Sequence, residues 1–522
     1  MPPKARGQRS DAATKRPRVA AKPPRVATKR AREIVKRARE AAKQSLGGAL
    51  AEKASDEFCL ALAAAPPPLP QGLARAAAYS GVEGFGGVEG LGAAVAPETT
   101  AVIELQDPVE EAGVEAAAPE ADPGRAKAVK QALEALGEHA GWAEAALAAA
   151  AREAAIRAER DRFYDQFGAI RDEVERGAAT LATGSAAPPR IGIAAAPVQA
   201  CWLNSTIRAE AHASVLGEVA EHGAVERIDL PHRLEAEGGD VTIDDAAAFR
   251  AKAGLSGTGV LVAVIDTEVQ RDHPALAGRV VHRRNYTQEP WGTPSPHGTA
   301  VAGEFAAAAE GFTGVAPGVQ IYNYKILALQ KALNGTNFEG WLAIQHALED
   351  GVRVANCSWK SPAKPDGKSR EVKACDKAWR RGMVIVKSVG NAGPGPGTLT
   401  APADAEGVLT VGATNAGGTK IASYSSHGPT FDGRHRPHVV APGGERGAGI
   451  GGIAAGGFIG TLPEPGTSFA APQVAGMAAL LIEREPALTP DQVRDRIVAT
   501  CKKLRGAKVD EQGAGLVTPS AL

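Results

Sequence analysis

The chain has 522 residues, of which 44% are hydrophobic and 4% aromatic, a length and composition that fit three or four domains with an alanine-rich core. Its 59 basic and 59 acidic residues give no formal net charge, but the charges are unevenly distributed along the chain. No run of about 18 strongly apolar residues is present, which excludes a helix able to span a bilayer.

Residues 1–50 are predicted to form a basic, disordered tail. Residues 1–45 carry fifteen Lys or Arg and three acidic residues, and Pro and Ala are frequent among them. Such a sequence cannot bury a core, so we predict disorder at least to Ala27. The charges can make weak contact with nucleic acid or another anionic surface, although no aromatic residue lies among them for base stacking. A solvated tether and a partner for the acidic stretch that follows are the alternatives.

Targeting signals and cysteines bear on the compartment. No continuous apolar stretch follows the basic start closely enough to form a secretory signal. The five cysteines are widely spaced, odd in number and without metal-ligand pairing, which fits a reducing compartment. We therefore expect a soluble cytoplasmic protein, and export by another route stays open.

The next two segments differ sharply in composition. Residues 51–124 are interpreted as a low-complexity linker that contains PPPLP, a GVEGFGGVEGLG near-repeat and ten acidic residues with no base between Arg75 and Arg125. Residues 125–185 are predicted to be helical and carry an apolar stripe at helical spacing: Ile156, Phe163, Phe167, Ile170 and Val174. The stripe predicts packing against a partner helix or a following domain.

Residues 186–248 are predicted to form a small α/β unit. A strand is expected at 200–209 and a returning strand at 225–230. Between them, Ser214 is predicted to begin a short helix that Gly223 ends.

Asp266 follows a continuous apolar run, residues 260–265, which comes after a glycine-rich turn. Such a run predicts a strand buried on both faces of a parallel sheet. Asp266 would then lie at the carboxyl end of the strand, where ligand crevices form in open α/β sheets. Taken alone, an Asp in this position is better explained as a turn or helix-capping residue.

His297 begins the segment HGTAVAGEF, whose small residues predict a helix lying close to a sheet. Imidazole titrates near neutrality, so it can take a hydroxyl proton and return it to a leaving amine. A purely structural histidine is the alternative.

Ser468 and Asn391 follow later in the chain. Ser468 precedes an apolar helical stretch, residues 474–482, and Pro472 is predicted to lie in its first turn. The hydroxyl would therefore lie at a helix N-terminus, where the dipole favours negative charge. Asn391, between Gly390 and Gly393, is predicted on a tight loop with an amide able to donate to an oxyanion. An N-cap role for the serine and a turn role for the asparagine are the alternatives.

The order Asp, His, Ser along the chain resembles the subtilisin-like serine protease family. The resemblance covers roughly residues 249–505 and includes GVAPGVQIYNYKIL, VRVANCSW, IASYSSHGP and VVAPG. It implies a three-layer α/β peptidase domain at 249–522, with a mainly parallel central sheet, that hydrolyses peptide bonds through an acyl-enzyme. Serine-carboxyl peptidases, which use Glu as base and Asp as oxyanion donor, and trypsin-like proteases, whose order is His, Asp, Ser, fit less well.

The resemblance also implies the roles of individual residues. The orienting acid, the general base and the nucleophile are Asp266, His297 and Ser468. The implied oxyanion donor is Asn391. The implied substrate-binding positions are Ser358, Trp359, Lys360 and Gly390. Protein or peptide substrates are the implied partners, and no cofactor is implied.

The unit at 186–248 resembles the second half of the inhibitory propeptides that precede subtilisin-like domains. We hypothesise a zymogen whose α/β unit packs on the peptidase domain. The chain between about Leu234 and Gly254 would then lie in the active-site cleft until it is cut.

Three departures from the family pattern bear on function. Glu268 stands where a small residue is common; if it points inward it favours the protonated imidazole, and if outward it has no effect. The run Ser-Trp-Lys-Ser at 358–361 replaces Ser-Leu-Gly-Gly and changes the expected pocket. EFAAAAEGFTG lacks the Asn-rich insertion that holds calcium in secreted bacterial members, so we predict no calcium site there. The first two departures motivate the alternative of a catalytically degenerate binding scaffold.

Overall fold

The structure, a computed structural model, describes residues 98–105, 140–182, 198–236, 254–445, 450–462 and 465–522. All of them fall within Pro97–Leu522, one of the two units into which the chain divides. The predictions made for the basic tail and for most of the linker lie outside the described residues, as does the segment 237–253. No helix in the described ranges combines the length and the apolarity needed to cross a membrane.

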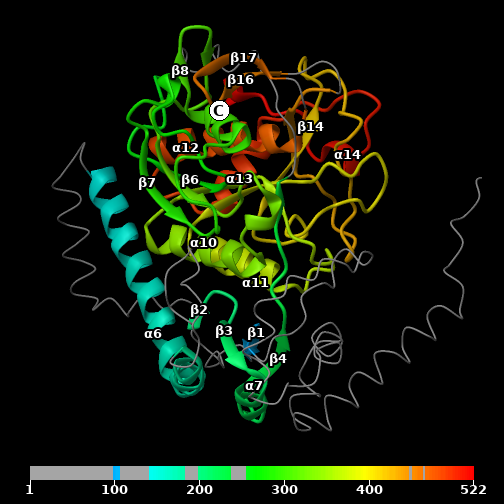
Figure 1. Cartoon of the computed structure of the whole chain (residues 1–522). Helices are drawn as coiled ribbons and strands as arrows, with labels where there is room; N and C mark the ends of the chain where they lie inside the picture. Colours follow the sequence, from blue (N-terminus) through cyan, green and yellow to red (C-terminus); the bar gives the residue numbers. More distant parts are fainter. Residues whose placement is uncertain (1–97, 106–139, 183–197, 237–253, 446–449, 463–464) are drawn as a thin grey trace, which may run out of the picture. The chain divides into compact units, whose positions relative to one another are not determined.

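A seven-stranded parallel sheet forms the middle layer of the peptidase region (Figure 1). Its strand order is β15-β14-β13-β11-β6-β10-β7. In chain order the bounds are β6 Leu261–Asp266, β7 Val280–Asn285, β10 Gln320–Lys325, β11 Val354–Cys357, β13 Val384–Ser388, β14 Leu409–Thr414 and β15 Val439–Pro442.

Strand β6 determines where a site can form. Its residues from Val262 to Asp266 are buried, as the continuous apolar run predicts. The strand order reverses beside β6, because β10 and β7 lie on one side of it and β11 and the later strands lie on the other. Ligand crevices form at such a switch point, outside the carboxyl ends of the strands.

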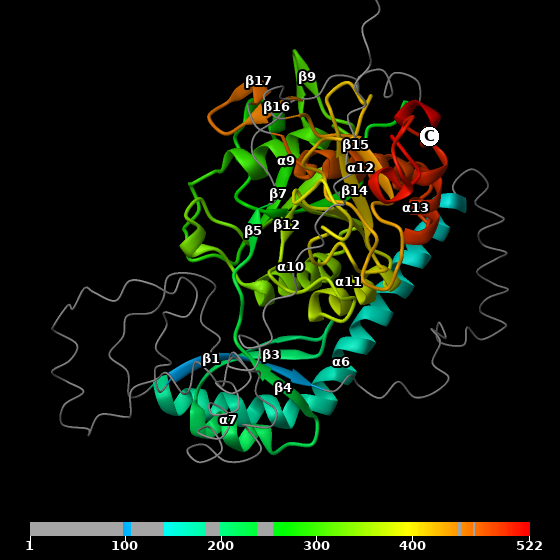
Figure 2. The same cartoon turned by 90° about the vertical axis from the view of Figure 1, so that its right-hand side faces the viewer.

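Helices cover both faces of the sheet (Figure 2), which confirms the expected three-layer α/β architecture. Helices α9 (Pro296–Ala306) and α12 (Thr467–Arg484) contact each other on one face, and α10 (Asn337–Glu349) and α11 (Arg370–Arg380) do so on the other. The first pair can approach closely because small residues line their contact. A Cβ atom on Gly476 of α12 would lie only 3.1 Å from Phe305 Cβ of α9.

The remaining elements of this region are short. The two-stranded pairs are β8 with β9, β16 with β17 and β5 with β12. Their bounds are β5 Glu235–Ala236, β8 Ala308–Ala309, β9 Phe312–Thr313, β12 Trp359–Lys360, β16 Ile450–Ala454 and β17 Phe458–Leu462. The other helices are η2 Pro274–Leu276, η3 Lys331–Leu333, α13 Pro490–Ala499, α14 Val509–Gln512 and η4 Pro519–Ala521.

A second, antiparallel sheet precedes the peptidase region, with strand order β2-β3-β1-β4. Its elements in chain order are β1 Glu98–Leu105, α6 Ala140–Ala182, β2 Val198–Cys201, β3 Thr206–His212, α7 Ala213–Ala220 and β4 Val225–Asp229. The succession βαββαβ with this strand order is the split βαβ arrangement. We call these six elements the N-terminal α/β unit.

The unit corrects two sequence predictions. Residues 98–105 were interpreted as linker, yet they form a strand between β3 and β4. Residues 200–209 do not form one strand, because a turn at 202–205 separates β2 from β3. Ser205 in that turn has φ 54°, the left-handed region, which a continuous strand cannot contain.

Helix α6 is the longest element in the described ranges, with 43 residues. The predicted apolar stripe is buried at four of its positions, Ile156, Phe163, Phe167 and Ile170, and the side chain of Val174 lies outside the described part. Within the unit, α6 packs on β3, β2 and α7. The stripe is therefore a core face, as its spacing predicts.

Candidate active site

Asp266 and His297 meet at the carboxyl end of β6. Asp266 is the last residue of the strand and His297 the second residue of α9. Asp266 Oδ1 lies 2.7 Å from His297 Nδ1, and both side chains are buried. The backbone N–H of Thr267 donates to the same oxygen at 2.6 Å. The carboxylate therefore fixes the ring orientation and favours the tautomer with a proton on Nδ1.

The start of α9 is held against β6 by local hydrogen bonds. Ser295 is the N-cap, and its hydroxyl accepts from the His297 N–H at 3.2 Å. Gly298 N–H donates to Thr267 Oγ1 at 2.8 Å. A Cβ on Gly298 would lie 2.5 Å from that oxygen, so only glycine allows the helix to approach the strand end this closely.

Ser468 is the second residue of α12 and is fully buried. Its hydroxyl donates to Ser358 O at 3.4 Å, and the ring of Phe469 lies 5.4 Å from the ring of His297. The helix begins at Thr467, earlier than predicted, so Pro472 lies inside the helix and not in its first turn. The hydroxyl nevertheless lies at the helix N-terminus, and the next residue, Phe469, is the one that contacts the imidazole.

Asn391 is held by the first residue of the same helix. Its Oδ1 accepts from Thr467 N at 3.0 Å and from Thr467 Oγ1 at 2.8 Å. The amide oxygen is thus engaged, and the Nδ2 group is the part of the side chain that can donate to an oxyanion. Gly390, before it, has φ 114°, and a Cβ there would lie 2.8 Å from Ser426 Oγ. This backbone position requires glycine.

Glu268 fits neither of the two expected orientations. It is 3% exposed, and its carboxylate accepts from the N–H groups of Gly292 and Thr293 and pairs with Lys325 Nζ at 3.3 Å. Lys325 is itself fully buried and also pairs with Glu289 at 2.9 Å. The charge of Glu268 is therefore compensated by an ammonium group and not directed at the imidazole. Nothing in the sequence around Lys325 signalled this pair.

The substrate-side strand β12 presents a usable backbone edge despite its large residues. Trp359 is fully buried, Ser358 likewise, and Lys360 is half-buried. Strand β12 pairs antiparallel with β5, in the register Trp359↔Ala236 and Lys360↔Glu235. The replacement of Leu-Gly by Trp-Lys therefore leaves room for an extended backbone alongside.

The structure places Asp266 at the carboxyl end of β6, His297 and Ser468 in the first turns of α9 and α12, and Asn391 in the loop after β13. Direct contacts join Asp266 to His297, and Asn391 to the start of α12. Within the described ranges, no group of three or more His, Cys, Asp or Glu is arranged to hold a metal ion. The supporting residues Ser295 and Thr267 were missed, although the order Ser-Pro-His is a recognisable N-cap and N1 signal.

This part of the chain is similar in sequence to known proteins. Residues 257–515 match the sequence profile of the subtilase family. Subtilisin from Bacillus pumilus is 34% identical over 279 residues, which cover 51% of this chain and 92% of that protein. Serine protease AprX and subtilisin E from Bacillus subtilis (strain 168) are 31% and 34% identical, over 50% and 51% of this chain. This chain spans 66% of the length of each of these two.

Proposed function

This chain belongs to the subtilase family of subtilisin-like serine proteases, and we propose that it is an endopeptidase that hydrolyses peptide bonds through an acyl-enzyme. The observation that carries the proposal is the 2.7 Å contact between Asp266 and His297 at the switch point of the sheet, with Ser468 at the start of the adjoining helix. Protein or peptide substrates follow from this activity.

The proposed reaction assigns one step to each side chain. Ser468 Oγ attacks the scissile carbonyl carbon while His297 takes its proton, and the C–N bond breaks as that proton passes to the leaving amine. Water then hydrolyses the ester by the same proton transfers. Asp266 stabilises the imidazolium formed in both halves. In the resting structure the Ser468 hydroxyl donates to Ser358 O, so the first step includes a rotation of this hydroxyl towards the imidazole.

Replacing Asn391 by Ala tests the oxyanion donor. We expect kcat to fall by about 10²- to 10³-fold with little change in KM, because the donor acts on charge that develops only in the transition state. Asn391→Asp is the matched variant, since it retains an oxygen for Thr467 and loses the donor. Peptide hydrolysis under steady-state conditions measures both variants, and an unchanged kcat in either contradicts the assignment.

We further propose that the N-terminal α/β unit is an inhibitory propeptide. Support comes from its contacts with α10 and α11 of the peptidase region. Trp202, in the turn between β2 and β3, is fully buried; its backbone N–H donates to Gln345 and its ring N–H to Glu349, both at 2.8 Å. The turn that interrupts the predicted strand thus supplies a contact with the peptidase region.

Charged pairs surround this contact. Arg370, at the start of α11, is 6% exposed and donates to Glu104 at 3.0 Å, to Glu226 at 2.7 Å and to the carbonyl of Asn204 at 3.0 Å. Glu159 of α6 pairs at 3.0 Å with Lys377 of α11 and at 2.5 Å with Arg381, the C-cap residue of that helix. Lys377 and Arg381 hold the pKa of the Glu159 carboxyl below its usual value, against the effect of its own burial.

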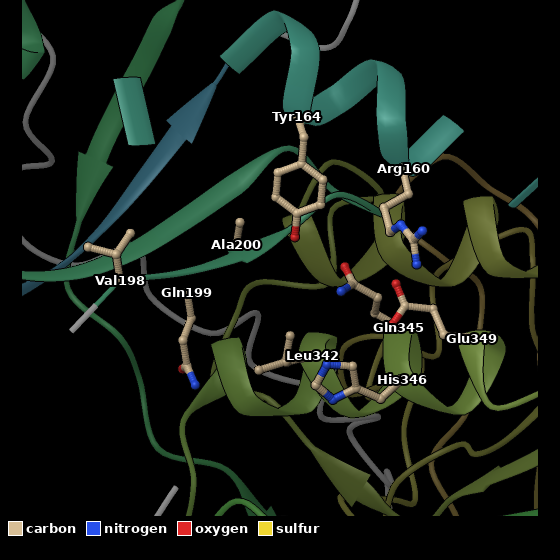
Figure 3. Close-up of a pocket in the computed structure, with 9 residues that line it drawn as sticks. All are labelled: Arg160, Tyr164, Val198, Gln199, Ala200, Leu342, Gln345, His346 and Glu349. Atoms are coloured by element: carbon tan, nitrogen blue, oxygen red, sulfur yellow. The ribbon is translucent and has the colours of Figure 1, made fainter. Parts of the chain in front are cut away.

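An open pocket of about 530 Å³ also lies beside this contact, where α6 and β2 face α10 (Figure 3). Arg160, Gln345 and Glu349 point into it, with His346 on its floor. Burial lowers the pKa of His346 to about 4, so this ring is neutral at physiological pH. An interface with polar groups around a gap resembles those between separable domains more than a domain core, which supports a unit that can leave.

Replacing Arg370 by Ala tests the inhibitory contact. The change leaves Glu104 and Glu226 of the N-terminal α/β unit without the cation they share. We therefore expect the free energy with which the unit binds the peptidase region to weaken by about 2–4 kcal/mol. The lag before the full-length chain becomes active against a peptide substrate should then shorten about 10-fold or more. Arg380→Ala, an exposed arginine on the same helix, is the control and should keep the lag of the unmodified chain. A lag that Arg370→Ala leaves unaltered contradicts the proposal.

The two features that motivated the alternative of a catalytically degenerate binding scaffold do not support it. Glu268 is neutralised by Lys325, and β12 still offers its backbone edge. Contact of the basic tail with nucleic acid or an anionic surface, and the cytoplasmic location, stay predictions from the sequence.

A further inference from the structure

Residues 232–236 follow the N-terminal α/β unit and lie as an extended segment between two parts of the peptidase region, residues 335–337 and β12. On one side, Leu234 N–H donates to Gly335 O at 3.1 Å, and Asn337 N–H donates to His232 O at 2.6 Å. On the other side, β5 pairs with β12. An extended peptide held by backbone hydrogen bonds on both sides gains affinity without regard to sequence, and its specificity comes from alternate side chains.

The first such side chain is that of Leu234, which is fully buried. It lies against Gly340 and the ring of Trp359, because a Cβ on Gly340 would be 3.0 Å from Leu234 Cδ1 and 3.3 Å from the Trp359 ring. Asn334 Nδ2 donates to the Leu234 carbonyl at 2.7 Å and fixes its position. The absence of a side chain at 340 thus creates space for one aliphatic residue.

The next position carries charge. The register places Glu235 directly opposite Lys360. Residues directly opposite in an antiparallel pair present their side chains on the same face, where unlike charges attract and like charges repel. Lys360 is half-buried, and the family pattern described above has glycine at this position. A peptide bound in this register therefore meets a cation where that pattern has glycine.

The same register relates these positions to the nucleophile. The pairing is antiparallel, so the peptide residue that follows the one opposite Lys360 lies opposite Trp359. The peptide residue after that lies opposite Ser358. The Ser358 carbonyl already accepts from Ser468 Oγ at 3.4 Å. A peptide in this register presents the carbonyl of that residue to the nucleophile.

The geometry points to a substrate class: peptides with an aliphatic residue in the place of Leu234 and an acidic residue in the place of Glu235, cut two residues after the acidic one. Lys360 is the specificity-determining residue, and Gly340 with Trp359 forms the aliphatic pocket. This inference rests on the proposed endopeptidase activity. The processing cut expected between about Leu234 and Gly254 falls mostly in the segment 237–253, which lies outside the described residues.

The test compares kcat/KM of the processed enzyme on internally quenched peptides that contain Leu-Glu-Ala-Glu-Gly-Gly, with Gln or Lys in place of the first Glu. We expect the Glu peptide to be cut about 5-fold faster than the Gln peptide and about 10-fold or more faster than the Lys peptide. Lys360→Glu should reverse the Glu-to-Lys ratio. Lys364→Glu, the same charge change at an exposed position four residues on, should preserve it.

The aliphatic pocket and the register have their own readouts. Exchanging Leu for Ala in the peptide should lower kcat/KM by about 10- to 100-fold. Gly340→Ala puts a methyl group into the pocket, so the ratio of kcat/KM between the Leu and Ala peptides should become smaller. Mass spectrometry of the fragments should show the cut two residues after the acidic one. Equal rates on the Glu and Lys peptides, a ratio indifferent to Lys360→Glu, or a cut elsewhere overturns the inference while leaving the peptidase in place. If no peptide is cut and no serine probe reacts, both proposals fall.

Discussion

Replacing Ser468 by Ala should lower kcat by about 10⁶-fold, the order of loss found when the nucleophile of subtilisin is removed. The expectation follows from its burial at the N-terminus of α12, where the next residue, Phe469, contacts the ring of His297. The Ser468 hydroxyl donates to the carbonyl of Ser358, the residue before β12. In the proposed reaction, only the Ser468 hydroxyl forms the covalent bond to the substrate. The residual rate should reflect binding and the oxyanion donors alone.

The measurement needs a processed form of the variant, since Ser468→Ala should also stop self-processing. Wild-type enzyme can cut the variant in trans, after which both forms are compared on the same peptide. Ser423→Ala, an exposed serine elsewhere in the peptidase region, is the control and should retain wild-type kcat. A processed Ser468→Ala protein that turns over within about 10-fold of wild type would remove the nucleophile from the account.

Replacing Asp266 by Asn should lower kcat by about 10⁴-fold. The corresponding change has that effect in another Ser-His-Asp protease, and loss of subtilisin's own acid costs about 3 × 10⁴. The physical reason lies in the 2.7 Å contact with His297 Nδ1. A carboxylate accepts the Nδ1 proton, whereas an amide can donate and stabilise the tautomer that cannot act as base at Nε2. The loss should be smaller than that of Ser468→Ala, because the nucleophile and base remain.

Asp266→Asn is close to isosteric, so the fold should survive, and thermal unfolding of the variant checks this. Asp272→Asn, an exposed aspartate six residues on, provides the matched control. KM should change little in both. If Asp266→Asn keeps most of its kcat, the carboxylate is structural and the turn alternative described for it is restored.

The residues of the site could be predicted because each lies in a short segment with its own local signal. The apolar run before Asp266 encodes a buried strand, the small residues after His297 encode a close-packed helix, and the glycine before Asn391 encodes a left-handed turn. These signals depend on residues within a few positions, so sequence alone carries them. The three-layer fold and the catalytic roles of these residues were implied by the family resemblance, which rests on the same segments.

What the sequence did not reveal depends on contacts between distant segments. Strand β1 is a single strand inside a compositionally biased region, and it becomes recognisable only through its pairing with β3 and β4. The environment of Glu268 depends on Lys325, 57 residues later. The turn at Trp202 satisfies its polar groups on α10, and no local pattern encodes that contact.

The central claim is that Ser468 is a nucleophile activated by His297 and Asp266. Treating the processed protein with a fluorophosphonate and mapping the adduct by mass spectrometry tests it most directly. We expect one adduct, on the peptide that contains Ser468, formed rapidly in the wild type and far more slowly in Asp266→Asn. A processed protein that gives no adduct, or carries it on another residue, contradicts the claim.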